Sequence, residues 1–264
     1  MNFKRLVILV LFDLRHSIFK LKGLVFLIPF FCFWYWIFKL LINKGTDFLV
    51  SQESFVITYF FLRDTEIVQS LLVNNPPTLS VFLVFSVATM PFFVMLAGNN
   101  QLATDAGTCT LRFLLTRCTR IELYLSRILS AYLLIVFTFI ITVVIAFFIS
   151  LKYDNFSFNE ILNYSWQVLL ITLVYSIPFV TFMAAISAFM SSALGTLLMS
   201  AVLYISLLVL GHYLPFEFSL LPSGLKQYLY IPGASNTTNI LAGIVTYTLI
   251  YAGIGWLIFN KRNL

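Results

Sequence analysis

The chain has 264 residues, of which 61% are hydrophobic and only 10% are charged, and its mean hydropathy is +0.98. These values exclude a soluble globular domain, because such domains carry about 25% charged residues and fewer apolar ones. We therefore predict an all-α polytopic membrane protein. The net charge of +6 describes how basic residues are distributed around the membrane, and it does not indicate nucleic-acid binding.

Residues 1–22 predict an amphipathic helix that lies in the cytoplasmic interface of the membrane. Apolar residues recur at helical spacing, and Asp13 and the basic residues fill the rest of the circumference. Ile8, Leu9, Phe12 and Phe19 fall off the apolar stripe, and burial of the far face of the helix against other protein would explain them. An uncleaved topogenic segment without a mechanical role is the alternative. The apolar stripe consists of Phe3, Leu6, Val7, Val10, Leu11, Leu14, Ile18 and Leu21.

Residues 23–264 predict a single membrane domain with six spans. A spanning helix needs about 20 mainly apolar residues. The segments that qualify are residues 23–41, 79–97, 123–151, 166–190, 194–213 and 240–259. Six spans place both termini on one side, together with eleven of the 16 Lys and Arg residues. Because cytoplasmic loops carry the excess of Lys and Arg, we expect both termini in the cytoplasm.

Two connections between the later spans are short. Residues 152–164 predict a polar loop on the outer side, and residues 191–194 leave room only for a tight helical hairpin on the cytoplasmic side. The fourth span carries Ala184, Ala188 and Ser192 at intervals of four residues. Small residues at this spacing let helix backbones approach closely in lipid, so we predict a helix-packing face there.

Residues 214–238 are half apolar but cannot form one helix. Three prolines and two glycines interrupt the segment. We predict two short helices that re-enter the outer leaflet, since irregular backbone at membrane depth needs protein or a cavity around it. A plain surface loop is the alternative.

Several kinds of chemistry are missing from the sequence. Apart from groups near span ends, such as Lys39, Glu122 and Arg127, the apolar runs carry no Asp, Glu, Lys or Arg near their midpoints, which argues against an ion-driven carrier. No P-loop motif is present, so energy from ATP would have to come through a partner. The three cysteines and two histidines have no ligand spacing, which predicts no metal site, no cofactor in this chain and no disulfide framework.

An enzyme would have to use His212 and Ser235. The Gly233-Ala-Ser235 run is superficially similar to the Gly-x-Ser of intramembrane serine proteases. That motif needs the serine at the end of a span and facing a histidine, whereas Ser235 follows Pro232 in a predicted loop. We therefore expect no catalytic residue.

The polar, basic segment between the second and third spans resembles the signature of ABC-2 type permeases. In that family an acidic residue, a Gly-Thr pair, Leu-Leu, Ser-Arg-Pro and a further Arg lead to a Lys at the head of the third span. Cys118 stands in place of the customary Pro, and Asp105 in place of the customary Glu. The matching positions are Asp105, Gly107, Thr108, Leu114, Leu115, Arg117, Arg120 and Arg127.

The resemblance implies a half-transporter of the bacterial inner membrane. Two permease chains, identical or different, would work with two P-loop ATPase subunits that bind ATP and Mg, and export is the direction that the resemblance favours. It also implies that residues 99–120 form a coupling segment seated in a groove of the ATPase, and that the broken outer segment helps to close the pathway.

The residues themselves fit such an interface. Leu111, Leu114 and Leu115 offer an apolar face, and charged residues offer a polar rim. A basic loop that sets topology and touches anionic headgroups is the alternative. For the whole protein, the alternative is a non-transporting membrane anchor or assembly scaffold. The predicted coupling residues are Asp105, Gly107, Thr108, Leu111, Arg112, Leu115, Arg117 and Arg120.

Overall fold

The computed structural model describes residues 3–19, 21–44, 75–99, 102–107, 110–213, 221–225, 229 and 234–262. All regular structure in these residues is helical. The elements are α1 (Phe3–Phe19), α2 (Leu21–Lys44), α6 (Pro77–Gly98), α7 (Ala103–Gly107), α8 (Thr110–Leu115), α9 (Arg120–Tyr153), α10 (Phe158–Phe189), α11 (Ala193–Tyr213), the 3₁₀ helix η1 (Pro222–Leu225) and α13 (Ala234–Lys261).

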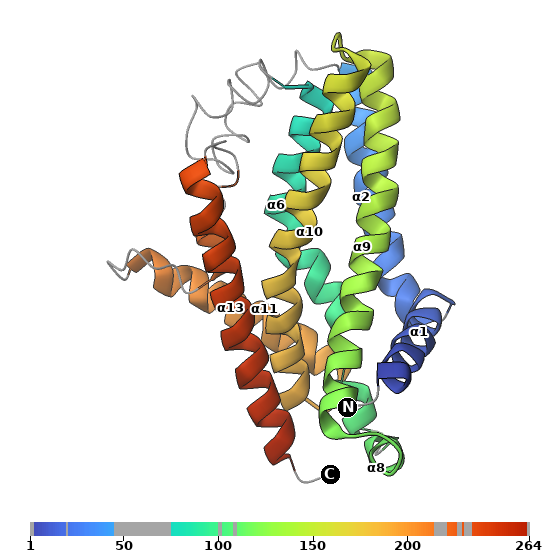
Figure 1. Cartoon of the computed structure of the whole chain (residues 1–264), viewed down its shortest axis with the longest axis vertical. Coiled ribbons are helices and arrows are strands. Elements are labelled where there is room, and N and C mark those ends of the chain that lie inside the picture. The colour runs from blue at the N-terminus through green and yellow to red at the C-terminus, as the bar shows by residue number, and fades with distance from the viewer. Residues whose placement is uncertain are drawn as a thin grey trace.

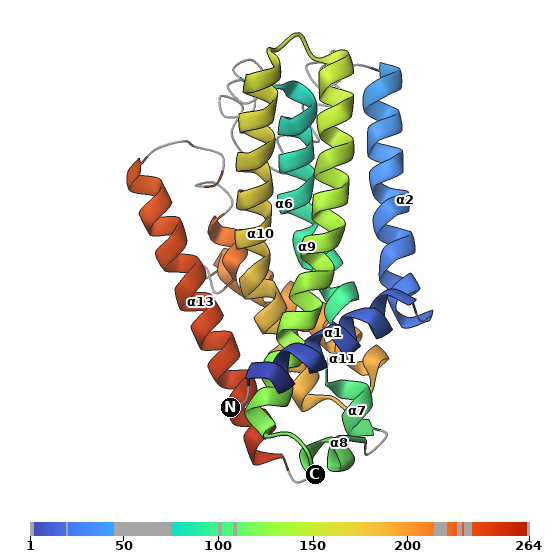
Figure 2. The ribbon, with the colours of Figure 1, turned by 45° about the vertical axis from the view of Figure 1, so that its right-hand side comes forward.

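Six of these helices are long and apolar enough to cross a membrane, which confirms the predicted all-α fold with six candidate spans. Four of them, α2, α6, α9 and α10, run side by side along the long axis (Figures 1 and 2). The helices α1, α7 and α8 lie at one end of this bundle, and the C-terminal end of α13 lies there too.

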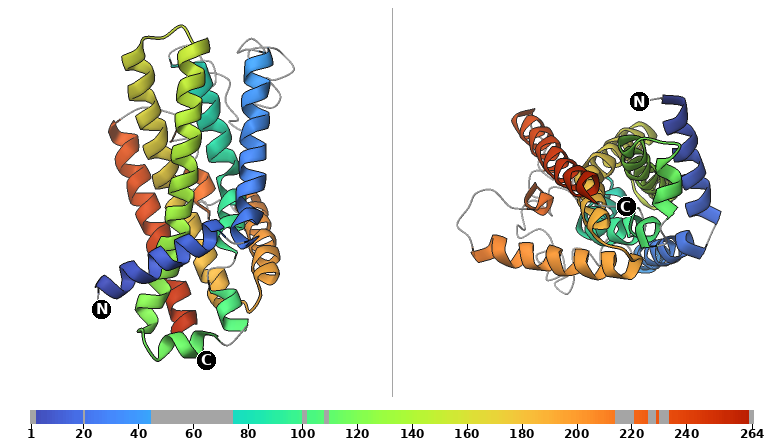
Figure 3. Two further views of the ribbon diagram at one scale, coloured as in Figure 1. Left: turned by 90° about the vertical axis from the view of Figure 1, so that its right-hand side faces the viewer. Right: turned by 90° about the horizontal axis from the view of Figure 1, so that it is seen from below.

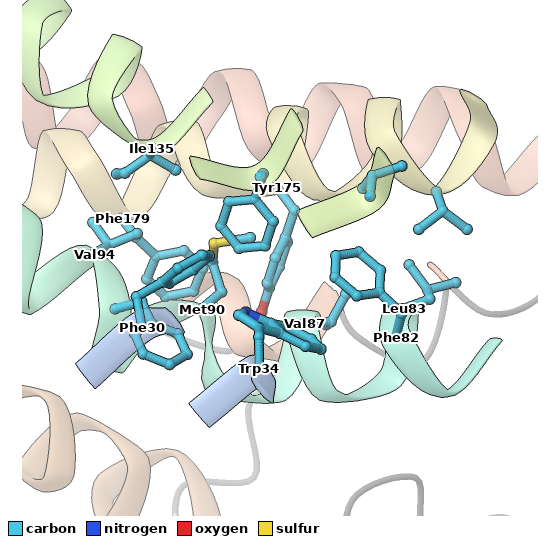
Figure 4. Packing of buried hydrophobic residues seen from close by; sticks show 14 of the residues in the cluster. Phe30, Trp34, Phe82, Leu83, Val87, Met90, Val94, Ile135, Tyr175 and Phe179 are labelled. Atoms are coloured by element: carbon cyan, nitrogen blue, oxygen red, sulfur yellow. The ribbon is translucent and has the colours of Figure 1, made fainter. Parts of the chain in front are cut away.

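Aromatic rings from three helices hold the bundle together. Phe30 and Trp34 of α2 are fully buried, and their rings lie against α6 and α9 (Figure 4). The ring of Trp34 lies 4.4 Å from that of Phe82, and the ring of Phe30 lies 4.9 Å from Phe93 and 5.4 Å from Phe139. Edge-to-face and tilted pairs at these distances contribute about 1 kcal/mol each beyond their buried area. The side chains of α2 therefore fix its position against two neighbouring helices.

The connection between α9 and α10 is shorter than the predicted loop of residues 152–164. The helix α9 runs to Tyr153 and α10 begins at Phe158. The hydroxyl of Ser157 accepts a hydrogen bond from the backbone N–H of Glu160, and the Glu160 carboxylate accepts one from the backbone N–H of Ser157. This capping box supplies partners for the first donors of α10, so the helix starts eight residues before the predicted span.

The N-terminal helix α1 lies across the end of the bundle (Figure 3), which is the direction expected of an interfacial helix. Leu6 and Val10 are buried against the bundle, as the apolar stripe predicts. Leu11, which belongs to the same stripe, is exposed to the surroundings of the protein. Asp13, which we placed on the polar side, is only 6% exposed because it faces α9.

The helix α11 does not fold back along α10 as the predicted hairpin requires. A turn of residues 190–192 separates the two helices, and α11 then runs across the bundle axis (Figures 1 and 3). Most of its large apolar side chains are exposed, as are many of those of α13. These two helices therefore offer apolar surface that the rest of the described chain leaves uncovered.

Small residues bring α13 close to α10. Ala184 and Ala188 are fully buried, and a Cβ atom at Gly255 would come within 2.8 Å of the α10 backbone. Ser192, which we placed on the same packing face, lies beyond the end of α10 and is exposed. Its hydroxyl accepts a hydrogen bond from the first turn of α11 instead.

The predicted re-entrant segment, residues 214–238, lies largely outside the described residues. The structure describes η1, Leu221 and Leu229 within it, and α13 already begins at Ala234.

Candidate functional site

The polar segment that the sequence singles out forms two short helices, α7 and α8, between α6 and α9. Figures 1 and 2 place them at the same end of the molecule as α1 and the C-terminal end of α13. The helix α8 lies at the outermost tip of this end (Figure 2). The contacts between this α7–α8 segment and the other helices determine which helices would move if α8 were displaced.

The first anchor joins the start of α7 to α10. The hydroxyl of Ser187, a fully buried residue of α10, accepts hydrogen bonds from the backbone N–H groups of Leu102 at 2.8 Å and Ala103 at 3.1 Å. The first N–H groups of a helix have no partner within the helix, so a side-chain acceptor from elsewhere satisfies them. Ser187 thus positions α7 directly on the fourth candidate span.

The second anchor is a close backbone approach at Gly107. A Cβ atom at this position would overlap the backbone carbonyl oxygen of Ser191, in the turn between α10 and α11. Only glycine lets the end of α7 lie this near to the turn. Thr108, the other half of the Gly-Thr pair, lies outside the described residues.

We predict that Gly107→Ala destabilises the protein by about 1–3 kcal/mol, because the new methyl group forces α7 away from the α10–α11 turn. The measurement is the thermal denaturation midpoint of the detergent-solubilised protein. Gly253→Ala is the matched control, since a Cβ atom at Gly253 would meet nothing within 4 Å. Equal midpoints for the two variants would contradict the close approach.

The third anchor is a cluster of three charges from three elements. The guanidinium of Arg127, on α9, donates one hydrogen bond to Asp13 of α1 at 2.5 Å and another to Asp105 of α7. The three side chains are 18%, 7% and 24% exposed, respectively. Charge-assisted bonds from one planar donor to two carboxylates fix geometry as well as energy. The cluster therefore connects the interfacial helix and the α7–α8 segment to a candidate span.

The pKa of the Asp13 carboxyl group is raised to about 6, chiefly because burial disfavours its charged form. Arg127 opposes this shift, and the nearby Asp105 carboxylate adds to it. The folded state therefore binds a proton more tightly than the unfolded chain, whose Asp pKa is about 3.9. The stability that Asp13 contributes is present in full below about pH 4 and is lost as the pH rises through 6.

We predict that this contribution makes the wild-type protein gain stability as the pH falls from about 6.5 to about 4.5, and that Asp13→Asn weakens the gain. Thermal denaturation across this pH range measures the gain in stability. The control for general charge effects is Arg15→Gln, because Arg15 lies near Asp13 in the sequence but is exposed. An unchanged pH profile in Asp13→Asn would show that Asp13 titrates as an ordinary surface carboxyl.

Arginines also bind the ends of two helices near this site. The guanidinium of Arg120 donates hydrogen bonds to three backbone carbonyls at the end of α13, at 2.5–3.3 Å. Arg262 does the same for two carbonyls at the end of α10, at 2.8 and 3.0 Å. Cations at helix C-termini satisfy orphan acceptors and complement the helix dipole. Arg120 therefore turns inward, away from the polar rim where we placed it.

The exposed surface of α8 also differs from the predicted face. Leu111 is only 1% exposed and packs into a small cluster with residues of α9, α10 and α13, so it is not available to a partner. Phe113 is 77% exposed, and Arg117 is exposed just beyond the helix. Leu114 and Leu115 are half-buried. The side chain of Arg112 lies outside the described part of the chain.

The residues of the enzyme hypothesis do not form a described site. Ser235 lies in the first turn of α13, not in the predicted loop, and the side chains of Ser235 and His212 lie outside the described part. Among the residues that the structure describes, no group of three His, Cys, Asp or Glu side chains could hold a metal ion.

Comparison with known proteins identifies no relative of the chain. No family model matches the chain, and no curated protein matches it. The fold and the candidate spans show a polytopic helical membrane protein.

Proposed function

We propose that the chain is the membrane-spanning permease subunit of an ATP-driven exporter of the ABC-2 type, and that a separate P-loop ATPase docks on α8. One observation carries the proposal. The tip of the molecule exposes an aromatic residue on α8, Phe113, and a basic residue just beyond it, Arg117, while the segment behind them is held by buried contacts to several helices. A protein interface of this kind places an aromatic anchor beside a charged rim.

The contacts of α7 give the docked ATPase a way to move the bundle. A displacement of α8 acts on α7, and α7 is bound to α10 through Ser187 and to α9 through Arg127. Arg127 also carries the displacement to α1 through Asp13. Differential contact between the ATPase and α8 in its ATP-bound and nucleotide-free states would shift the packing of these helices. ATP and Mg belong to the ATPase in this proposal.

The departure of Cys118 from the family pattern has a local reason. The backbone N–H groups of Arg117 and Cys118 both donate to the carbonyl of Leu114, at 3.1 and 3.0 Å, and close the last turn of α8. Proline at position 118 has no N–H to donate. This chain thus ends α8 with a backbone hydrogen bond where the family's customary proline would interrupt it.

The proposal also places the chain in the cell. With α8 facing the cytoplasm, both termini are cytoplasmic, and the protein is a multi-pass component of a bacterial inner membrane. A second permease chain, identical or different, completes the transporter, and the uncovered apolar faces of α11 and α13 are available to it or to lipid. The centres of the spans carry no charged residue, so they are compatible with apolar or amphiphilic cargo, such as lipids, amphiphilic peptides, hydrophobic drugs or glycan–lipid conjugates.

Photo-cross-linking in cells tests the docking site. A photoreactive amino acid replaces Phe113, and the same amino acid replaces Phe148 as the control, because Phe148 is 64% exposed but lies on α9 toward the opposite end. We expect position 113, and not 148, to capture a protein that contains a P-loop. Capture of a partner without a P-loop at position 113 would favour the membrane scaffold instead.

A further inference from the structure

A groove of about 510 Å³ lies between α2 and α9, outside the site described above. Its wall on α2 extends from Phe31 to Ile42, and its wall on α9 from Thr142 to Ile149. Its volume falls within the range of about 300–1,000 Å³ that is typical of small-molecule sites. The groove is open on one side, so a ligand could enter it from the surrounding lipid.

The length of the groove matches one lipid leaflet. The eleven residue steps from Phe31 to Ile42 span about 16 Å at the rise of an α-helix. The hydrocarbon core of a bilayer is about 30 Å thick, so each leaflet contributes about 15 Å. One extended acyl chain therefore fits along the groove.

The walls of the groove are mostly apolar, and their polar residues are Tyr35, Lys39 and Thr142. The hydroxyl of Thr142 donates within its own helix, to the carbonyls of Thr138 and Phe139, so it offers no donor to a ligand. Lys39 is the one charged residue among the described lining residues, and its side chain is exposed. A lysine on a span buries its stem along apolar surface and presents its ammonium group toward the headgroup level. Lys152 follows Ile149 on the same stripe of α9, toward the same end.

A second groove provides a comparison within the same protein. It lies between α9 and α10, has a volume of about 570 Å³, and is lined by apolar residues such as Val144 and Phe148 together with Asn163 and Ser165. None of its described lining residues is charged. The two grooves are thus similar in size and in apolar character, and they differ in the presence of a lysine.

We propose that the α2–α9 groove is a binding site for a phospholipid with an anionic headgroup. One acyl chain lies along Phe31, Trp34 and Phe38, and the headgroup phosphate pairs with the ammonium group of Lys39. Each Lys near a membrane surface contributes about 1 kcal/mol to the attraction of anionic lipid, which corresponds to about a fivefold change in affinity. The proposal does not depend on the transport function.

Native mass spectrometry of the purified protein tests the site, with phosphatidylglycerol and phosphatidylcholine added in turn to the detergent micelles. Ile145→Trp fills the α2–α9 groove, and Val144→Trp, at the adjacent position on α9, fills the uncharged groove. Lys39→Gln removes the charge, and Lys261→Gln removes an exposed lysine on α13 at the other end of the molecule. Gel filtration confirms that each variant is folded, and Ile149→Trp replaces Ile145→Trp if that variant aggregates.

We expect the wild-type protein to retain phosphatidylglycerol over phosphatidylcholine. Ile145→Trp should lose the bound phosphatidylglycerol, and Lys39→Gln should lose about fivefold in affinity for it, while both controls match the wild type. Equal retention in all the proteins would show an exchangeable annular lipid and overturn the proposal. A preference for phosphatidylglycerol that persists in Lys39→Gln would overturn it as well.

Discussion

Replacement of Arg127 by Gln is expected to lower the stability of the protein by about 3 kcal/mol, because removal of one partner leaves a buried charge without compensation. Asp13 of α1 and Asp105 of α7 both bind the guanidinium of Arg127. Without the guanidinium, the two carboxylates would face each other. A loss of this size corresponds to a fall of about 6–10 °C in the denaturation midpoint for a chain of this length. Differential scanning fluorimetry in detergent measures it.

A neutral version of the cluster separates charge from packing. The triple variant Asp13→Asn, Asp105→Asn and Arg127→Gln should recover most of the lost stability, since no unpaired charge then remains at the site. Arg15→Gln, on the exposed side of α1, should match the wild type. A triple variant as unstable as Arg127→Gln would mean that the shape of the arginine matters more than its charge.

The double variant Phe113→Ala and Arg117→Glu is expected to weaken binding of the proposed ATPase partner at least 30-fold. Loss of an aromatic anchor at the centre of an interface costs about 2 kcal/mol or more, and charge reversal at the rim adds repulsion. Both side chains are exposed, so the free energy of unfolding of the double variant should stay within about 0.5 kcal/mol of the wild-type value. Titration of the purified ATPase onto the immobilised protein measures the affinity.

Arg120 is a poor choice for the same test. Its guanidinium holds the carbonyls at the end of α13, so charge reversal would damage the fold together with any interface. Phe148→Ala is the matched control for the loss of an exposed aromatic side chain. Unchanged ATPase affinity in the double variant would remove α8 from the interface.

The spans could be predicted from the sequence because their signals are local. Runs of about 20 apolar residues identify the candidate spans. The start of α9 also has a local signal, since Thr119 and Glu122 form a capping box. The equivalent pair at Ser157 and Glu160 was present in the sequence, and it would have corrected the overlong loop before α10.

The contacts of the candidate site could not be predicted, because their partners are distant in the chain. Asp13 is separated from Arg127 by 114 residues, and Leu102 from Ser187 by 85. On its own helix Asp13 has the position of a solvated residue, and it is buried in the structure, where it pairs with Arg127 of α9. The direction of α11 had no signal either, because a helix that is apolar on every side does not specify which face it packs.

Spin-label distances in the protein reconstituted with its proposed ATPase partner test the central proposal, that energy enters through α8 and reaches the far end of the bundle. Labels at Ile42→Cys and Phe158→Cys, in a background with serine at the three native cysteines, report the separation of α2 and α10 at the end opposite α8. Trapping the ATPase with ATP should change this distance, and the change should disappear when Phe113→Ala and Arg117→Glu are added. A distance that does not respond to ATP, or a response that survives these two substitutions, would contradict the account.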